Sequence, residues 1–128
     1  MPTYDSTQFD PPAPLARVSL RVPDGDNAAT DVPMLIDSGA DLTLIPERSV
    51  ADLKLEVNQG ATYELEGFDG KRTLARSFQL ELVFLSRTFK GRFLLVNSRT
   101  GILGRNVLNH FALLLDGPGL NWQKQATG

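Results

Sequence analysis

Apolar and polar side chains alternate with a period of two along two stretches of this chain. Val18, Leu20 and Val22 alternate with polar residues over 15–22, and the same pattern runs over 78–84. Successive side chains of a β-strand point to opposite faces, so this period is typical of a strand with one buried face. The pattern predicts a half-buried strand in each of the two stretches.

Shorter apolar runs, bounded by residues that favour turns, predict further strands. They include residues 30–36, 42–45, 63–66, 89–96, 102–103, 112–115 and 120–123, with a brief strand at 55–57. Two short helices are expected, one after Pro46, which suits a first helical position, and one over 105–111. About nine short strands and two short helices indicate an all-β domain, closed or sandwich-like.

The length of 128 residues fits one domain, with prolines concentrated near its beginning. Residues 1–14 end in Asp-Pro-Pro-Ala-Pro, and proline removes backbone donors and favours extended backbone, so we expect a flexible N-terminal arm there. We place the folded domain at 15–123 and expect residues 124–128 to be a frayed tail.

Charge and composition exclude several classes of function. The net charge of −2 gives no basic field for nucleic acid and no polybasic membrane anchor. Cysteine is absent, which excludes disulfides and thiolate chemistry, and a single histidine, His110, cannot supply a multi-histidine metal site. No apolar run is long enough to span a membrane, and no signal peptide is evident, so we expect a cytoplasmic protein.

The stretch from Met34 to Ile45 carries the candidate chemistry. Two apolar runs flank Asp37-Ser38-Gly39-Ala40-Asp41, so a carboxylate is delivered where a buried strand ends. An acid near the core is a candidate for proton chemistry, because burial makes its ionisation costly. Asp-Ser-Gly by itself is also a common turn sequence that needs no function.

A second candidate feature is the hairpin predicted between residues 63–66 and 73–75. Its turn reads Gly67-Phe68-Asp69-Gly70, and Asp-Gly between extended segments favours a hairpin. Such a hairpin is either a lid over a binding cleft or an ordinary surface connection.

Two motifs together resemble the retroviral-type (retropepsin-like) aspartic proteases. The segment Leu35–Thr43 resembles their active-site segment, and Ile102–Leu108 resembles their second signature, in which two apolar residues and glycine precede a short helix. The 65 residues from Asp37 to Ile102 are close to the spacing in that family. The resemblance covers roughly residues 15–116, and the tail beyond resembles bacterial relatives. It implies a small closed β-barrel.

The resemblance also implies an activity, namely that of an aspartic endopeptidase acting on peptides or proteins. A homodimer would bring together Asp37 from each subunit, and the two acids would activate water without a metal or another cofactor. Ser38 would bond across the dimer axis, and Gly39 would let the loop backbone approach the carboxylates and supply an N–H. Ala40 would belong to the same supporting segment. Asp41 and Arg105 would form an ion pair between the loop and the helix.

The lid implied by the resemblance comprises Glu66, Gly67, Phe68, Asp69 and Gly70, which would close over an extended peptide. Asp69 makes this loop less rich in glycine than retroviral flaps. Two alternatives stay open: a dimer of the same fold that binds peptides without cleaving them, and a monomer with an incomplete site. Neither nucleic acid nor a membrane is expected as a partner. For His110, we favour a position at a helix end or on the surface over a catalytic role.

Overall fold

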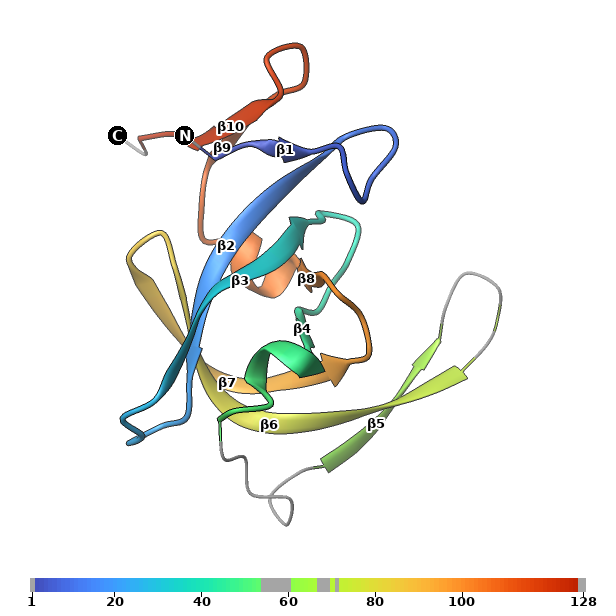
Figure 1. Cartoon of the computed structure of the whole chain (residues 1–128), viewed down its shortest axis with the longest axis vertical. Helices are drawn as coiled ribbons and strands as arrows, with labels where there is room; N and C mark the ends of the chain where they lie inside the picture. Colours follow the sequence, from blue (N-terminus) through green and yellow to red (C-terminus); the bar gives the residue numbers. More distant parts are fainter. Residues whose placement is uncertain (1, 54–60, 67–69, 71, 127–128) are drawn as a thin grey trace.

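The computed structural model describes residues 2–53, 61–66, 70 and 72–126. Within these ranges the chain is almost entirely β-structure, as predicted (Figure 1). The strands are β1 Tyr4–Asp5, β2 Ala13–Arg21, β3 Ala28–Ile36, β4 Leu44–Pro46, β5 Ala61–Glu66, β6 Arg72–Phe84, β7 Arg87–Val96, β8 Gly101–Leu103, β9 Leu113–Asp116 and β10 Asn121–Lys124. The two short helices are η1, a 3₁₀-helix at Glu47–Val50, and α1 at Arg105–Leu108. Neither helix is long or apolar enough to cross a membrane.

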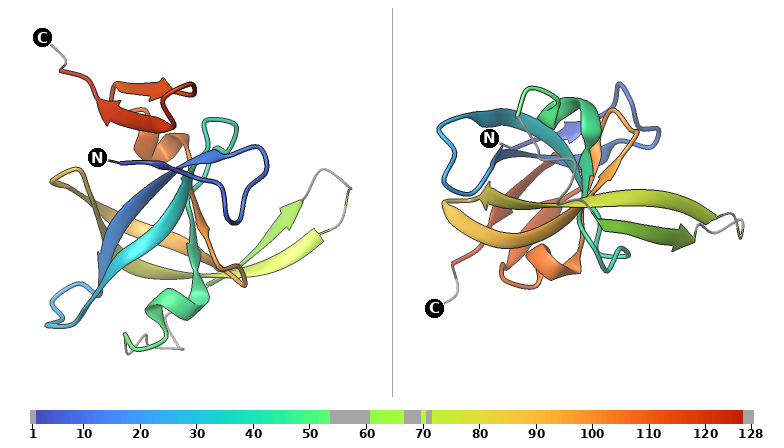
Figure 2. Two further views of the ribbon diagram at one scale, coloured as in Figure 1. Left: turned by 45° about the horizontal axis from the view of Figure 1, so that its top comes forward. Right: turned by 90° about the horizontal axis from the view of Figure 1, so that it is seen from below.

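Six strands close into a small barrel, as the sequence predicted. Their order is β2-β3-β8-β4-β7-β6, and pairing of β6 with β2 completes the ring (Figures 1 and 2). Most neighbours are antiparallel, but β3 runs parallel to β8, and β4 runs parallel to β7. The parallel pair places the end of β3 beside the end of β8, with Ile36 opposite Leu103. The two sequence motifs therefore meet at one end of the barrel.

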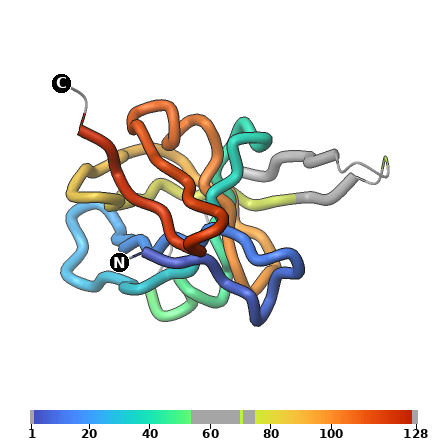
Figure 3. Tube along the Cα trace, turned by 90° about the horizontal axis from the view of Figure 1, so that it is seen from above, coloured from blue at the N-terminus to red at the C-terminus, as the bar shows by residue number. Residues whose placement is uncertain are grey.

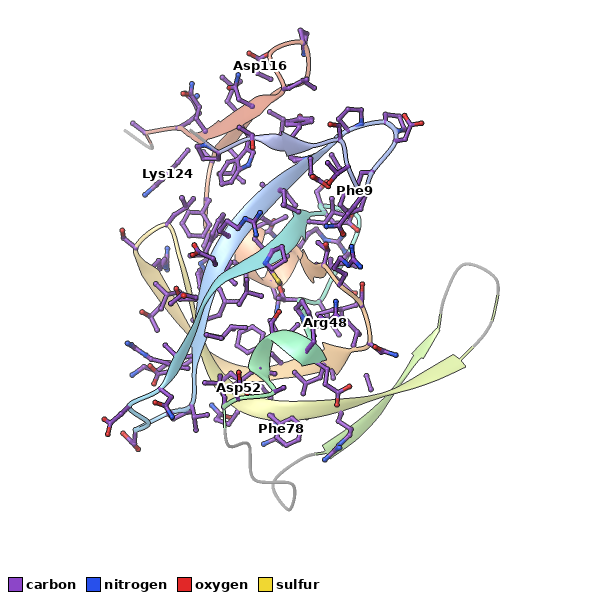
Figure 4. All side chains as sticks on the ribbon, viewed as in Figure 1. Phe9, Arg48, Asp52, Phe78, Asp116 and Lys124 are labelled. Carbon is purple, nitrogen blue, oxygen red and sulfur yellow. The ribbon has the colours of Figure 1, made fainter. Side chains whose placement is uncertain are left out.

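The alternating apolar side chains turn inward and fill the barrel (Figure 4). The core includes Val18 and Leu20 of β2, Met34 of β3, and Leu80 and Leu82 of β6. Each of these side chains is almost completely buried. Burial of apolar surface is the main favourable contribution to folding, so the period of two read from the sequence also identifies what stabilises the barrel.

A C-terminal hairpin made of β9 and β10 covers one end of the barrel. The side chain of Trp122 is only 2% exposed, lies against the Phe84 ring at 6.0 Å between centroids, and donates from Nε1 to the Leu15 carbonyl at 2.9 Å. The indole is therefore a packing residue. The strand β10 extends to Lys124, where the sequence predicted the start of a frayed tail.

The N-terminal segment differs from the predicted flexible arm because it is docked on the barrel. Within it β1 pairs with β2, Tyr4 donates its backbone N–H to the Leu120 carbonyl, and Trp122 donates to the Pro2 carbonyl. Residues 2–5 thus lie beside both the barrel and the C-terminal hairpin (Figure 3). These pairings hold the beginning of the segment against the barrel.

The strands β5 and β6 form a long antiparallel ribbon that leaves the barrel (Figure 2). Its register runs from Ala61 opposite Ser77 to Glu66 opposite Arg72, which matches the predicted hairpin. Of the predicted lid residues, Glu66 ends β5 and Gly70 is exposed with φ +78°. Gly67, Phe68 and Asp69 lie outside the described residues, as does the predicted brief strand at 55–57.

Candidate active site

The candidate catalytic loop, residues 37–43, connects β3 to β4. Asp37 follows the last residue of β3 and donates its backbone N–H to the Leu103 carbonyl at 3.1 Å. This bond continues the pairing of β3 with β8 by one residue, so the position of Asp37 is set by the barrel. Its side chain is half-buried, whereas Ser38, Gly39, Asp41 and Leu42 are exposed. The carboxylate therefore lies at the margin of the core, open to one side.

The loop turns on bonds to Asp37 itself. The carboxylate oxygen Oδ1 accepts the Gly39 N–H at 2.9 Å, and the Asp37 carbonyl accepts the Ala40 N–H at 3.1 Å. A side-chain bond to the backbone two residues on is the usual way an aspartate supports a turn. A Cβ at position 39 would lie 3.1 Å from Oδ1, closer than ordinary van der Waals contact, so glycine suits this position. The turn directs one carboxylate oxygen toward its own backbone.

Helix α1 is hydrogen-bonded to the catalytic loop. Arg105 and Asn106 donate their backbone N–H groups to the Ala40 and Asp41 carbonyls, at 2.8 and 3.3 Å. The Arg105 guanidinium donates from Nη1 to the Ser38 carbonyl at 2.7 Å. Three bonds therefore join the first turn of the helix to three carbonyls of the loop, those of Ser38, Ala40 and Asp41.

The predicted ion pair between Asp41 and Arg105 is not formed. An ion pair is formed elsewhere in the barrel, between Arg21 of β2 and Glu81 of β6. Asp41 is exposed, where water solvates its charge well, while the Ser38 carbonyl lies within reach of the guanidinium. An exposed ion pair gains little over two solvated charges, so bonding to the carbonyl prevails. Arg105 nevertheless links the helix to the loop, as the sequence indicated.

A buried hydroxyl that the sequence analysis did not single out connects the two motifs. The Thr43 side chain, 2% exposed, donates from Oγ1 to Asn106 Oδ1 at 2.7 Å and accepts the Gly104 N–H at 3.1 Å. A Cβ at Gly104 would collide with the Leu42 backbone, so glycine permits this close approach. The sequence did contain a sign of this role. Thr43 is the one polar residue in the run Leu42–Ile45, and it lies two positions before buried Ile45, so both side chains point to the same face of an extended segment.

The structure thus brings most predicted site residues together. Asp37, Ser38, Gly39, Ala40 and Asp41 form one loop, and Arg105 contacts it. The predicted lid residues Glu66 and Gly70 lie at the end of the β5–β6 ribbon, apart from this cluster (Figure 1). His110 is exposed just beyond α1, with its ring 5.3 Å from the Phe89 ring between centroids, which agrees with the expected surface position.

Comparison with known proteins agrees with this architecture. The sequence matches the aspartyl protease family over residues 18–107, a range that contains the whole loop and most of α1. A similar solved structure is that of EIAV protease complexed with the inhibitor HBY-793, with a TM-score of 0.57 and 22% sequence identity. The match covers 83% of this chain and 91% of that chain, and it concerns the fold. No match was found among curated protein sequences.

Proposed function

Because this chain belongs to the aspartyl protease family, we propose that it is an endopeptidase whose catalytic water is activated by Asp37 of two identical subunits. The observation that carries the proposal is a strand-positioned carboxylate, half-buried in a loop whose neighbouring residues are exposed. One such loop supplies one acid. Peptide hydrolysis needs both a base for water and an acid for the substrate carbonyl and the leaving amine. A second copy of the loop supplies the partner group.

In the dimer, a two-fold axis would pass between the two loops and bring the Asp37 carboxyl groups into contact at about 3 Å. Two carboxylates this close share one proton, because both cannot readily ionise together. The ionised member takes a proton from water as the water oxygen attacks the peptide carbonyl carbon. The protonated member donates its proton to the carbonyl oxygen, which gives a gem-diol. The carboxyl group that took the proton from water then passes it to the amine nitrogen as the C–N bond breaks, and the other carboxylate takes a proton back from the gem-diol, so that the pair again holds one proton. Activity is therefore expected at acidic to mildly acidic pH.

The edge strand β5 supports an extended substrate. It lies at one end of the eight-stranded sheet and pairs with β6 alone among the described strands. A polypeptide can add to an open edge through main-chain hydrogen bonds, as in other strand-addition complexes. In this proposal the β5–β6 ribbon is the lid, and the substrate passes between it and the catalytic loop.

The test is the Asp37→Asn variant, assayed against a peptide library prepared from unfolded proteins. The amide keeps the size of the side chain but cannot act as a base, so cleavage should be abolished while the circular dichroism spectrum and the dimerisation measured by sedimentation are retained. Asp52→Asn, which neutralises an exposed carboxylate beyond η1, is the matched control and should cleave normally. Undiminished cleavage by Asp37→Asn refutes the proposed role.

Mixing the subunits tests the shared site separately. Excess Asp37→Asn protein should inhibit the wild-type protein, because mixed dimers carry one carboxylate and one amide. If activity is independent of the added variant under conditions where subunits exchange, each chain acts alone and the dyad is wrong. A dimer that binds peptides and leaves them intact favours instead the non-catalytic binding module.

A further inference from the structure

A pocket of about 360 Å³ lies where the N-terminal segment and the C-terminal hairpin meet the barrel. None of its lining residues belongs to the catalytic loop, to α1 or to the lid. The lid is at the opposite end of β6, which begins at Arg72 and ends at Phe84 (Figure 1). Small-molecule sites measure roughly 300–1,000 Å³, so the volume suits a small ligand. The lining includes Thr3, Leu15, Arg17, Phe84, Leu85 and Trp122.

Hydrogen bonds between the walls hold this pocket in shape. Trp122 donates from Nε1 to the Leu15 carbonyl at 2.9 Å and from its backbone N–H to the Pro2 carbonyl at 3.2 Å. Leu15 donates its backbone N–H to the Thr3 carbonyl, also at 3.2 Å. These bonds tie three separate segments together around the pocket. A ligand therefore meets walls that are already ordered, which lowers the entropic cost of binding.

The body of the pocket is apolar. Phe84 and Trp122, each 2% exposed, lie at its base, and the half-buried Leu15 and Leu85 line its walls. Leu85 also occupies the β6–β7 turn with φ +50°, a left-handed position where asparagine or glycine is usual. The turn alone does not favour leucine there, whereas an apolar wall does. The lining thus suits an apolar group.

The charged member of the lining is Arg17. Its side chain is exposed, and its bond from Nη1 to the Asp31 carbonyl is long, at 3.4 Å. Arg17 forms no ion pair with an acid among the described residues. The carboxylate of Asp5, in the adjoining segment, instead accepts the Thr7 hydroxyl at 2.8 Å and the Gln8 N–H at 3.0 Å. A guanidinium matches a carboxylate through two parallel bonds, and its single charge balances one negative charge.

We propose that this pocket binds a monocarboxylate with an apolar body. The carboxylate is held by Arg17, and the body lies against Leu15 and Leu85. This inference goes beyond the peptidase proposal and does not depend on it. Two sources share the required chemistry, a medium-chain fatty acid and the free C-terminus of a peptide that ends in an apolar residue. Because the pocket joins both terminal segments to the barrel, its occupant should also raise the melting temperature.

The fluorescence of Trp122 tests the proposal directly, since it is the only tryptophan of the chain and lines the pocket. The wild type is titrated with decanoate, with N-acetylleucine and with decanol, the neutral counterpart of decanoate. We expect a saturable change with a carboxylate. Arg17→Gln should weaken carboxylate binding about tenfold or more, because a hydrogen bond to a charged group is lost, and should leave decanol binding unchanged. Arg48→Gln, at an exposed arginine of η1, is the matched control and should bind as the wild type does.

A second variant tests the position of the ligand. Thr3→Phe narrows the pocket and keeps the backbone bond to Leu15, so it should weaken binding of decanoate and decanol alike. Saturation by decanoate alone identifies the fatty acid as the ligand class, and saturation by N-acetylleucine alone identifies the peptide end. The proposal is overturned if neither carboxylate gives a saturable change. It is equally overturned if Arg17→Gln or Thr3→Phe binds the carboxylate as tightly as the wild type does.

Discussion

Replacing Thr43 by valine removes one hydroxyl that joins the catalytic loop to α1. Valine has nearly the same shape, but it can neither accept the Gly104 N–H nor donate to Asn106. A buried N–H left without a partner costs about 1–3 kcal/mol, and a lost hydrogen bond to the more exposed Asn106 about 0.5–1.5 kcal/mol. The added methyl group returns about 0.8 kcal/mol through apolar burial. We expect a net loss of about 1–4 kcal/mol in the free energy of unfolding.

Trp122 provides the assay. It is the only tryptophan of the chain and is almost fully buried, so its fluorescence reports unfolding. With a urea m-value of about 1–3 kcal/mol/M, a loss of about 2 kcal/mol lowers the midpoint by about 1 M. Protein concentration must be held constant, since association stabilises the folded state. Thr43→Ser is the control: it keeps the hydroxyl and loses one methyl group, at about 0.5–1.5 kcal/mol. A Thr43→Val protein as stable as the wild type would refute this account of the hydroxyl.

Two further predictions concern charged groups. Arg105→Ala removes the hydrogen bond to the Ser38 carbonyl but keeps the backbone hydrogen bonds between α1 and the loop. Because the loop is then less precisely positioned, kcat should fall about 10- to 100-fold, with little change in thermal stability. An unchanged kcat would contradict this role of Arg105. The pKa of Asp5 lies below its ordinary value of 3.8, first because the Gln8 backbone N–H donates to its carboxylate and then because the Thr7 hydroxyl does. A lowered pKa stabilises the fold above the ordinary pKa, and the effect is lost as pH falls through the folded-state pKa. In an NMR titration, Thr7→Ala should raise the pKa of Asp5 only part of the way, because the Gln8 bond remains; a value that does not move would show that the hydroxyl contributes nothing.

Local pattern predicted the elements that build the barrel. Alternation around Leu20 and along 78–84 identified β2 and β6 because a strand with one buried face leaves that period in the sequence. The turn at Asp37 and the short helix after Gly104 followed from residues whose backbone preferences act over a few positions. These are the features that local interactions determine.

Contacts between residues far apart in the sequence could not be predicted in this way. The docking of residues 2–5 depends on the Leu120 carbonyl and on Trp122, more than a hundred positions away, and no local pattern identifies such a partner. The charges of Asp41 and Arg105 suggested an ion pair, yet the choice between a carboxylate and the Ser38 carbonyl depends on exposure in three dimensions. The role of Thr43 likewise became evident only when Gly104 and Asn106 lay beside it.

The contact between the two ends of the chain has a kinetic consequence. Pairing of residues 2–4 with residues 120–122 closes a loop of nearly the whole polypeptide. The loss of chain entropy on closing this loop is larger than for contacts within the barrel, which close shorter loops. This junction should therefore form after the transition state for folding. Interactions that form late slow unfolding and leave the folding rate almost unchanged. The terminal strands should therefore lower the unfolding rate of the native protein, while the barrel determines the folding rate.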